Sequence, residues 1–237
     1  MLVRLDKFLA ETKIGSRSEV KNHIKKGLVS VNGVPALKPE IKINVEKDVV
    51  EYQGDVVTKK GFVYYMLNKP QGVVSATVDN LNQTVVSLIK EKYQEELFPV
   101  GRLDKDTEGL LLLTNDGQLA HSLLSPKKHV DKTYYALIRG YVSSAEVEKF
   151  KEGLDIGERK LTMPADLCVL KAGEISEIQV TICEGKFHQV KRMFQAVDKE
   201  VIYLKRISMG RLHLDKTLQP GEYRPLSEWE IQMLKEK

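Results

Sequence analysis

Acidic and basic side chains are concentrated in one short stretch between Phe98 and Gly117, which reads FPVGRLDKDTEGLLLLTNDG. Its four leucines, residues 110–113, predict a strand that is apolar on both faces and therefore buried. Carboxylates at the end of a buried strand are costly to remove from water, so each needs a reason to be there. Either the acids cap turns in a polar loop, or one of them is held there for chemistry. The charged residues of interest are Arg102, Asp104, Asp106 and Glu108.

A second group of polar side chains follows the segment from Ile175 to Cys183, whose alternating pattern predicts a strand. Gly185 permits a sharp turn from that strand into a helix. The residues expected to face the core at helical spacing are Phe187, Val190, Phe194 and Val197. The polar flank of the helix would carry His188, Gln189, Lys191 and Arg192. A basic helix of this kind is either solvated or placed beside an anion.

Two shorter patterns place polar groups at the ends of further strands. Residues 62–67 predict a strand, and the Lys69-Pro70-Gln71-Gly72 sequence after it predicts a turn. Residues 132–138 predict another strand, which begins with Lys132 and carries Tyr134. Taken alone, the first pattern fits an ordinary turn, and Tyr134 fits a strand tyrosine with a buried ring and a hydrated hydroxyl.

The first sixty residues combine a surplus of positive charge with a helical pattern. They contain 12 Lys and Arg against 8 Asp and Glu, whereas the remainder holds 25 of each. Residues 2–13 predict a helix, Ser16 to Glu19 predicts the capped start of a second, and Asn32-Gly33 predicts a tight hairpin turn. A polyanion-binding surface explains the charge, and so does chance clustering. The basic residues that could form this surface are Arg4, Lys7, Arg17, Lys21, Lys25 and Lys26.

Length and composition narrow the class of protein. A chain of 237 residues is long enough for one large domain or two modest ones. No apolar run approaches the ~18 residues of a membrane span, and no secretory segment opens the chain. Cys168 and Cys183 lack metal-ligand spacing, so reduced thiols in a cytoplasmic protein are the simplest interpretation, with a disulfide as the alternative. Neither a dinucleotide nor a phosphate-loop motif is present, and no cofactor is expected.

Together these motifs carry a resemblance to a known family. Four motifs resemble those of pseudouridine synthases related to the small-ribosomal-subunit enzyme. They are GRLDKDTEGLLLLTNDG, the Lys-Pro-x-Gly turn, the Lys-x-Tyr strand and EGKFHQVKRMF. The final GRLHLDKTLQPGEYRPLSEWEI resembles the end of that enzyme, which favours it over large-subunit relatives. RLDKFLA and SRSEVKNHIKKGLVSVNG resemble the small RNA-binding module named after the fourth protein of the small ribosomal subunit.

The resemblance assigns roles to individual residues. Asp104 would be the nucleophile, Tyr134 would stack on the target base, and Lys191 would pair with Asp104, with Arg192 as the alternative cation. Arg102 would fill the space left by a flipped base or hold a phosphate. Asp106 receives no chemical role. The other residues assigned to substrate or RNA binding are Lys69, Lys132, His188 and Gln189, with the six basic residues of the N-terminal module.

The expected fold class is α+β, with the pseudouridine synthase fold implied by the resemblance. A small helical RNA-binding module with a short hairpin, residues 1–58, would precede a catalytic domain, residues 61–237. That domain would be a mixed, mainly antiparallel sheet flanked by helices. The segment from Gln53 to Gly61 would link the two parts. Helices are expected from Gln118 to Leu124, from Ala145 to Gly153, and from an N-cap at Thr84 to about Tyr93.

The function implied by the resemblance is site-specific isomerisation of a uridine to pseudouridine in 16S rRNA, of the type that acts at position 516. The substrate would be 16S rRNA or an assembling small subunit, and the enzyme a cytoplasmic monomer without metal or cofactor. Three alternatives remain open at this point. They are a synthase for large-subunit rRNA, a non-catalytic RNA-binding protein, and a metal-dependent hydrolase that uses Asp104, Asp106 and Glu108.

Overall fold

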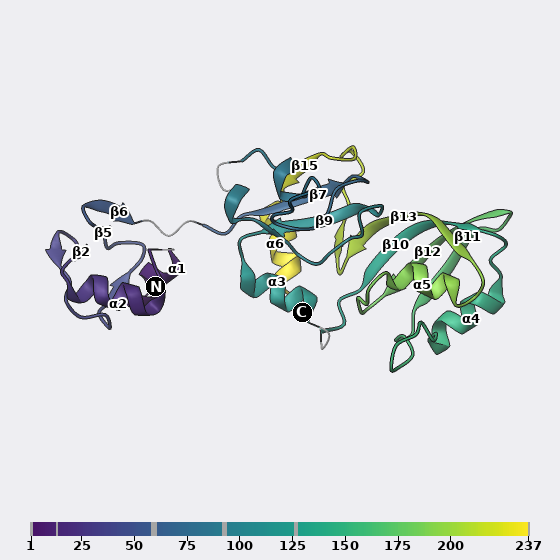
Figure 1. Ribbon diagram of the computed structural model, residues 1–237, viewed down its shortest axis with the longest axis horizontal. Helices are drawn as coiled ribbons and strands as arrows, with labels where there is room; N and C mark the ends of the chain where they lie inside the picture. Colours follow the sequence, from purple (N-terminus) through teal and green to yellow (C-terminus); the bar gives the residue numbers. More distant parts are fainter. Residues whose placement is uncertain (1, 13, 58–60, 92–93, 126–127, 237) are drawn as a thin grey trace. The chain divides into compact units, whose positions relative to one another are not determined.

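The computed structural model describes residues 2–12, 14–57, 61–91, 94–125 and 128–236 (Figure 1). The chain divides into two compact units, Met1–Gly61 and Phe62–Lys237. Each unit has apolar clusters of its own: one lies in the first unit and two lie in the second. Each unit is therefore described by itself.

In its described residues, the first unit contains two helices and two small sheets. Strand β1 pairs with β4, and the other strands form a sheet in the order β3-β2-β5-β6. The helices pack over a core that includes Val20 and Ile24, as their spacing predicts. The elements are β1 (Leu2–Arg4), α1 (Leu5–Glu11), α2 (Arg17–Lys25), β2 (Val29–Val31), β3 (Val34–Pro35), β4 (Lys42–Asn44), β5 (Val50–Tyr52) and β6 (Asp55–Val57).

Local signals in this unit are mostly confirmed. Ser16 and Glu19 form the predicted capping box at the start of α2. Asn32 and Gly33 both have positive φ, 52° and 75°, as the predicted tight hairpin requires. The helix predicted from residue 2 instead begins at Leu5, because Leu2–Arg4 pair with β4 far along the chain.

The predicted linker is partly wrong. Gln53 and Gly54 both have positive φ and form a hairpin turn that leads into β6, so the ordered unit continues to Val57. Residues 58–60 of the predicted linker lie outside the described residues.

The second unit is built on one mixed sheet in the order β11-β12-β10-β13-β9-β7-β15, with β14 beside β13 and β8 beside β9. Neighbouring strands are antiparallel except β9 and β13, which run parallel. The predicted mixed, mainly antiparallel sheet is confirmed. Its strands are β7 (Tyr64–Lys69), β8 (Phe98–Pro99), β9 (Glu108–Thr114), β10 (Lys132–Arg139), β11 (Asp166–Lys171), β12 (Ile175–Ile182), β13 (Glu200–Met209), β14 (Leu212–His213) and β15 (Tyr223–Pro225).

Strand β9 is the buried strand predicted from its four leucines. Leu111 and Leu113 belong to one apolar cluster, whereas Leu110 and Leu112 belong to the other. Because successive side chains of a strand point to opposite faces, the two clusters lie on opposite faces of the sheet. The strand is therefore covered on both faces, and the loop that precedes it is fixed at the end where it joins β9.

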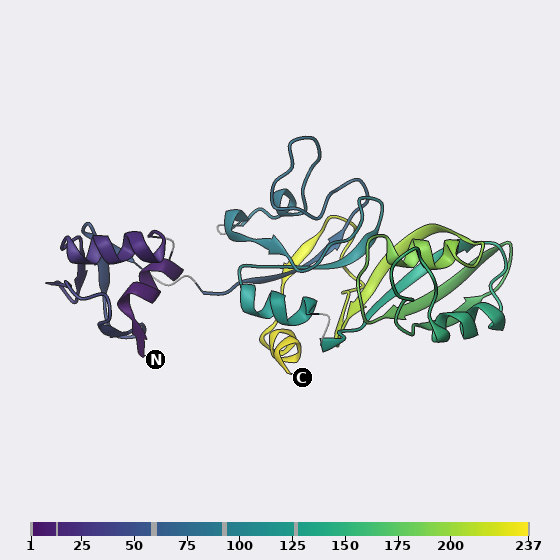
Figure 2. The same ribbon diagram turned by 60° about the horizontal axis from the view of Figure 1, so that its bottom comes forward.

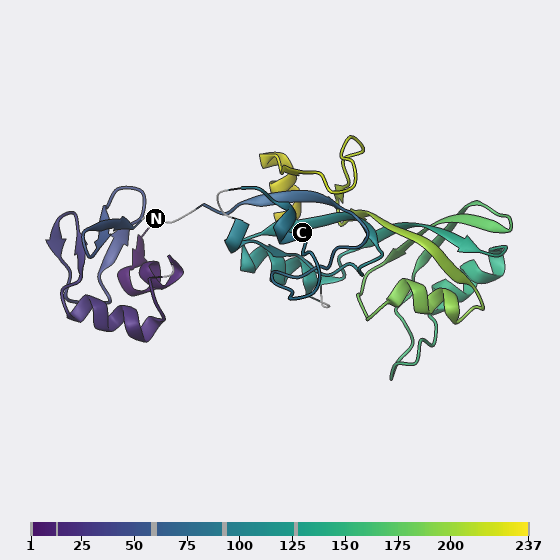
Figure 3. The same ribbon diagram turned by 45° about the horizontal axis from the view of Figure 1, so that its top comes forward.

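Helices cover both faces of the sheet. Helices α4 (Ser144–Glu152) and α5 (Gln189–Gln195) lie on the same side of strands β10–β13 (Figures 1 and 3), and their Phe150 and Phe194 rings are 4.8 Å apart. Helices α3 (Gly117–Leu124) and α6 (Glu228–Lys235) lie side by side against the other cluster (Figure 2). The predicted helices at α3 and α4 are confirmed to within two residues.

The helix predicted after Thr84 is wrong. Thr84 Oγ1 accepts a hydrogen bond from the Ser87 amide, as a cap would, but the segment makes only a single turn, η1 (Val86–Leu88), and later η2 (Gln94–Glu96). Ile89 is fully buried in an extended conformation, so core packing ends the helix after one turn. The predicted end at Tyr93 lies outside the described residues. The strand predicted from residue 62 begins at Tyr64, and Phe62 is exposed.

Gly109 allows β9 and β13 to approach closely. Its φ is +102°, and a Cβ at this position would overlap the Arg206 carbonyl oxygen and lie 2.8 Å from the Arg206 nitrogen. Gly109→Ala should therefore destabilise the protein by about 3 kcal/mol or more, measured as the free energy of unfolding in urea. Gly185→Ala is the matched control, because nothing lies within 4 Å of its Cβ. Equal stability of the two variants would contradict this account.

Candidate active site

A cavity of about 840 Å³ lies over the middle of the second unit's sheet. It is bounded by the loop before β9, by strands β10 and β13, and by the segment that joins β12 to α5. Asp104, Tyr134, Lys191 and Arg206 all line it. The cavity therefore brings together residues that are more than a hundred positions apart in the sequence.

The loop that carries Asp104 is held from both sides. Ser75 Oγ donates to the Leu103 carbonyl at 2.8 Å and accepts from the Leu103 amide at 3.0 Å. The Thr107 amide donates to the Asp104 carbonyl at 3.1 Å, which closes a turn around the carboxylate. The Gly72 amide donates to the Lys105 carbonyl at 2.8 Å. Asp104 is thus presented on rigid backbone at the end of a core strand, which is the arrangement that a reacting group requires.

Lys69 is a buried lysine whose side chain is hydrogen-bonded to this loop. Its side chain is fully buried, and Nζ donates to the carbonyls of Pro70 at 2.9 Å, Thr107 at 2.8 Å and Lys105 at 3.3 Å. Burial lowers the pKa of Lys69 to about 8, against the opposing effect of nearby carboxylates, chiefly Asp106. The assignment of Lys69 to RNA binding is therefore wrong. Lys69 and Gly72 both donate hydrogen bonds to carbonyls of the Asp104 loop, so the Lys-Pro-x-Gly turn holds that loop in place.

Lys191 lies between two carboxylates. Its Nζ is 3.4 Å from Asp104 Oδ2 and 2.6 Å from Asp106 Oδ1. Burial raises the pKa of Asp106, but the hydrogen bond and charge of Lys191 outweigh burial and hold that pKa below its usual range. Asp106 is therefore the nearer partner of the predicted catalytic cation, which sequence reasoning did not anticipate.

His188 is the second nitrogen-bearing side chain beside Asp104. Its Nε2 is 3.5 Å from Asp104 Oδ1, and its φ of 49° places it in the left-handed region just before α5. A histidine in this conformation is uncommon and is held there by its surroundings. The sharp turn therefore occurs at His188, whereas the sequence analysis placed it at Gly185.

Phe187 is exposed, contrary to the prediction that it faces the core. It is 73% exposed, and its ring stacks on the His188 ring at 3.7 Å, while Val190, Phe194 and Val197 are buried as predicted. The helix begins only at Gln189, so helical spacing does not extend back to Phe187. An exposed aromatic pair therefore stands next to Asp104.

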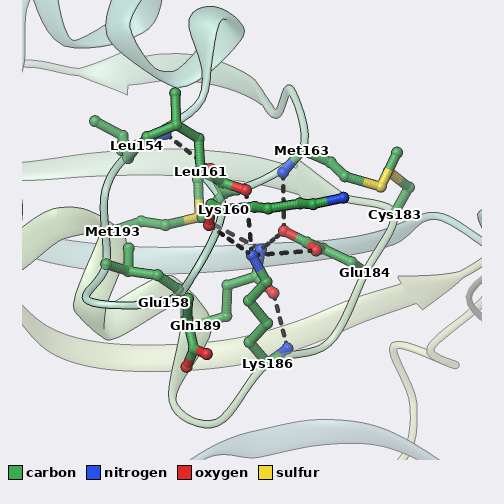
Figure 4. A network of polar contacts seen from close by, with 12 residues as sticks. Leu154, Glu158, Lys160, Leu161, Met163, Cys183, Glu184, Lys186, Gln189 and Met193 are labelled. Carbon is green, nitrogen blue, oxygen red and sulfur yellow. Dashed lines mark hydrogen bonds and ion pairs between the residues drawn. The ribbon is translucent and has the colours of Figure 1, made fainter.

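Gln189 and Glu184 anchor the segment that carries His188 and Lys191 (Figure 4). Gln189 is 4% exposed, and its Nε2 donates to Glu184 Oε1 at 2.8 Å while its Oε1 accepts from the Lys186 amide at 2.9 Å. Glu184 Oε1 also accepts from the Met163 amide at 2.9 Å. Gln189 thus holds this segment in place and also lines the cavity, and its role in substrate or RNA binding stays a prediction.

Arg192 points away from Asp104. Its Nη1 donates to Glu158 Oε1 at 2.9 Å and to the Phe187 carbonyl at 3.1 Å, and its Nη2 donates to the Ile156 carbonyl. Of the two cations that the sequence left open, Lys191 is the one beside Asp104. Arg192 instead holds the neighbouring loop.

Tyr134 and its neighbours form one wall of the cavity. The Tyr134 side chain is 8% exposed, and Tyr134 pairs in register with Arg206 on β13. Lys132 Nζ donates to the Val130 carbonyl at 2.7 Å, and burial, followed by the charge of Arg206, lowers the pKa of Lys132. Arg206 was not identified from the sequence, because Lys205-Arg206 at the end of a strand resembles a solvated pair.

The remaining predicted RNA-binding residues are at the surface. Arg102 is exposed at the rim of the cavity. In the first unit, the Arg4 guanidinium is bound by Asp6 at 2.8 Å, and Lys7 lies 3.7 Å from Glu11. The exposed cations on and just after α2 are Arg17, Lys21, Lys25 and Lys26.

Metal binding, disulfide formation and membrane insertion each need features of another kind. No group of three or more His, Cys, Asp or Glu side chains there is placed to hold a metal ion, and Glu108 accepts a hydrogen bond from Tyr203 at 2.6 Å. Cys168 and Cys183 are free thiols. None of the helices in these ranges combines the length and apolar character needed to cross a membrane.

The sequence was compared with families of known proteins. The family described as RNA pseudouridylate synthase matches residues 63–196, and the S4 domain matches residues 3–50. An uncharacterized RNA pseudouridine synthase of Bacillus subtilis, YtzG, is 49% identical over 99% of both chains. Ribosomal small subunit pseudouridine synthase A is 43% identical in Vibrio cholerae and 40% identical in Escherichia coli K12, over 97% of this chain and 98% of each relative.

A solved structure has the same fold. A crystal structure of a pseudouridylate synthase is 38% identical, with a TM-score of 0.71 over 98% of this chain and 99% of that chain. This similarity confirms the fold expected from the motifs.

Proposed function

Because the chain belongs to the RNA pseudouridylate synthase family, we propose that it converts one uridine of 16S rRNA to pseudouridine, with Asp104 as the nucleophile. The observation that carries the proposal is the position of Asp104. Its carboxylate stands at the cavity with the Lys191 ammonium 3.4 Å and the His188 imidazole 3.5 Å away, beside the buried ring of Tyr134. A carboxylate nucleophile, an ammonium group beside it and an aromatic wall are what this reaction needs.

The reaction breaks the bond between ribose C1′ and uracil N1 and forms one between C1′ and C5. The proton on C5 is lost, and N1 gains one, so the reaction consumes no redox equivalent and no nucleotide. The carboxylate can add to the ribose carbon or to the ring, or assist proton removal from the sugar, and each route needs Asp104 ionised. The Lys191 ammonium lies 3.4 Å from the Asp104 carboxylate, where it can neutralise that charge. Tyr134 lines the same cavity, which supports its proposed role of stacking on the extruded base.

We place the target in the small subunit because the Vibrio cholerae and Escherichia coli relatives are named for it and match nearly the whole chain. The proposed position is 516 of 16S rRNA, and the proposed enzyme is a cytoplasmic monomer. The described residues that line the cavity all belong to the second unit.

The proposal is tested by mapping pseudouridine in rRNA from cells with and without this protein. One 16S position should lose its modification in the deletion strain, and the purified protein should restore it on a 16S transcript or an immature small subunit. Loss of a 23S pseudouridine with an intact 16S pattern would contradict the proposed substrate.

The basic residues of α2 are proposed to bind RNA phosphates. Replacing Arg17, Lys21 and Lys25 together with glutamine should weaken RNA binding and lower the slope of log K against log salt by about two, since each phosphate contact contributes roughly 0.7 to 0.9. Lys149→Gln with Lys151→Gln, on α4, is the control. An unchanged slope in the triple variant would show that this face does not touch RNA.

A further inference from the structure

Arg206 is a buried arginine whose hydrogen bonds are incomplete. Its side chain is 2% exposed, and Nε donates to the Leu110 carbonyl at 2.8 Å. Its Nη2 is buried without an acceptor in the described part of the chain. A buried guanidinium nitrogen without a partner is costly, and native proteins rarely keep one without a purpose. The structure therefore calls for an acceptor that the protein itself does not supply.

The missing acceptor is expected in the cavity. Arg206 lines the cavity with Asp104 and Tyr134, and it pairs in register with Tyr134 across β10 and β13. Residues opposite each other on neighbouring strands have adjacent side chains on the same face of the sheet. Thr107 Oγ1, a second buried atom without a partner in these ranges, belongs to another residue of the cavity lining. Two residues that line the same cavity therefore each carry a buried polar atom without a hydrogen-bond partner in these ranges.

The chemistry of the guanidinium narrows the ligand. Arginine only donates hydrogen bonds, so its partner must be an acceptor. A backbone phosphate and a ring carbonyl of uracil both qualify. A phosphate remains outside with the sugar, whereas a flipped base is inserted into the pocket beside the aromatic wall. The burial of Arg206 and its register with Tyr134 favour the base.

We propose that Arg206 donates a hydrogen bond to a ring carbonyl of the extruded uracil and holds the base while it is detached from the ribose. This inference rests on the proposed function. Turning uracil by half a turn about the axis through N3 and C6 exchanges N1 with C5 and also exchanges the carbonyls at C2 and C4. A fixed donor therefore meets a carbonyl both before and after the turn. Arg206 transfers no proton, and it prevents loss of the free base.

The test couples a change in the enzyme to a change of one atom in the substrate. A 16S rRNA fragment is made with uridine, 2-thiouridine or 4-thiouridine at the target position, since sulfur is a poorer hydrogen-bond acceptor than oxygen. We expect wild-type enzyme to lose about tenfold to a hundredfold in kcat on each thio substrate, the worth of one charged hydrogen bond. On the natural substrate, Arg206→Gln should lower kcat by the same factor. On the thio substrates, its kcat should fall little further, because the hydrogen bond is already absent.

Arg224→Gln is the matched control, because Arg224 is a structural arginine that binds Asp215 at 2.7 Å and Glu230 at 2.8 Å. The effect of Arg224→Gln on kcat should be the same on the uridine and thiouridine substrates, which means that the two changes are not coupled. Arg206→Lys retains a buried charge, and if Arg206→Gln fails to fold, the same comparison is made with the lysine variant. Release of free uracil, measured by chromatography, should increase in the Arg206 variants.

The outcomes separate two claims. Wild-type enzyme that forms no pseudouridine on the unmodified fragment would overturn the proposed function. An active wild type whose Arg206 and thio effects simply add would overturn the carbonyl contact. Coupling to a methylphosphonate at the target nucleotide, and not to sulfur, would show that Arg206 binds phosphate and would likewise overturn it. Coupling at one carbonyl alone would overturn the claim that the contact persists through the turn.

Discussion

Asp104→Asn should leave a folded protein that binds RNA but forms pseudouridine at least about a thousandfold more slowly. The substitution keeps the shape of the side chain and removes the charge that every route of the reaction requires. The loop should stay in place, because its anchors are Ser75 and Lys69 and not the Asp104 carboxylate. The measurement is single-turnover release of tritium from C5 of uridine in a 16S transcript, with RNA affinity measured separately.

Asp106→Asn is the matched control, two residues away and chemically identical. The Asp106 side chain is 68% exposed and forms an ion pair with Lys191, which keeps its second contact, to Asp104, when Asp106 is neutral. We expect this variant to remain within about tenfold of wild type. Substantial turnover by Asp104→Asn, or an equal loss in both variants, would remove Asp104 from the role of nucleophile.

The sequence patterns predicted the frame of this site because each depends on nearby residues. The four leucines of β9 and the alternation of β12 follow from local spacing, as does the capping box at Ser16 in the first unit. Asp104 was assigned as the nucleophile from the resemblance of its motif, whereas the patterns alone place it in the loop before the buried strand β9. Periodicity and capping are therefore enough to place this loop at a strand end, but they do not identify the nucleophile within it.

The partners of the site could not be found in this way, because tertiary contacts decide them. Lys69 resembles a surface lysine at a turn, yet three carbonyls of the Asp104 loop draw it into the interior. Phe187 resembles a core residue at helical spacing, yet the left-handed turn at His188 breaks that spacing. Arg206 resembles a surface residue, yet it is buried where β9 approaches β13 closely at Gly109. Each of these residues lies around the cavity or the Asp104 loop, where charged side chains are buried and an aromatic side chain is exposed.

Lys191→Met should lower the rate strongly at neutral pH, by about a hundredfold, and the rate should partly recover as pH rises. In the wild type one ammonium lies 3.4 Å from Asp104 and 2.6 Å from Asp106. Without it the two carboxylates repel each other, and burial is no longer opposed, so the pKa of Asp106 should rise. Proton uptake by the pair is then easier at low pH, and higher pH restores the ionised nucleophile. The measurement is a pH–rate profile from single turnovers, and Lys191→Arg should retain more activity than Lys191→Met.

The geometry also predicts how a second substitution behaves in this background. Adding Asp106→Asn to Lys191→Met removes the competing carboxylate, so Asp104 can stay charged without its cation. The double variant should therefore be faster at neutral pH than Lys191→Met alone, although Asp106→Asn by itself gives no gain. Such coupling is expected only between groups in contact. If the double variant is no faster and Lys191→Met has the pH profile of the wild type, then Lys191 does not act by keeping Asp104 ionised, and contact with RNA phosphate would be its role.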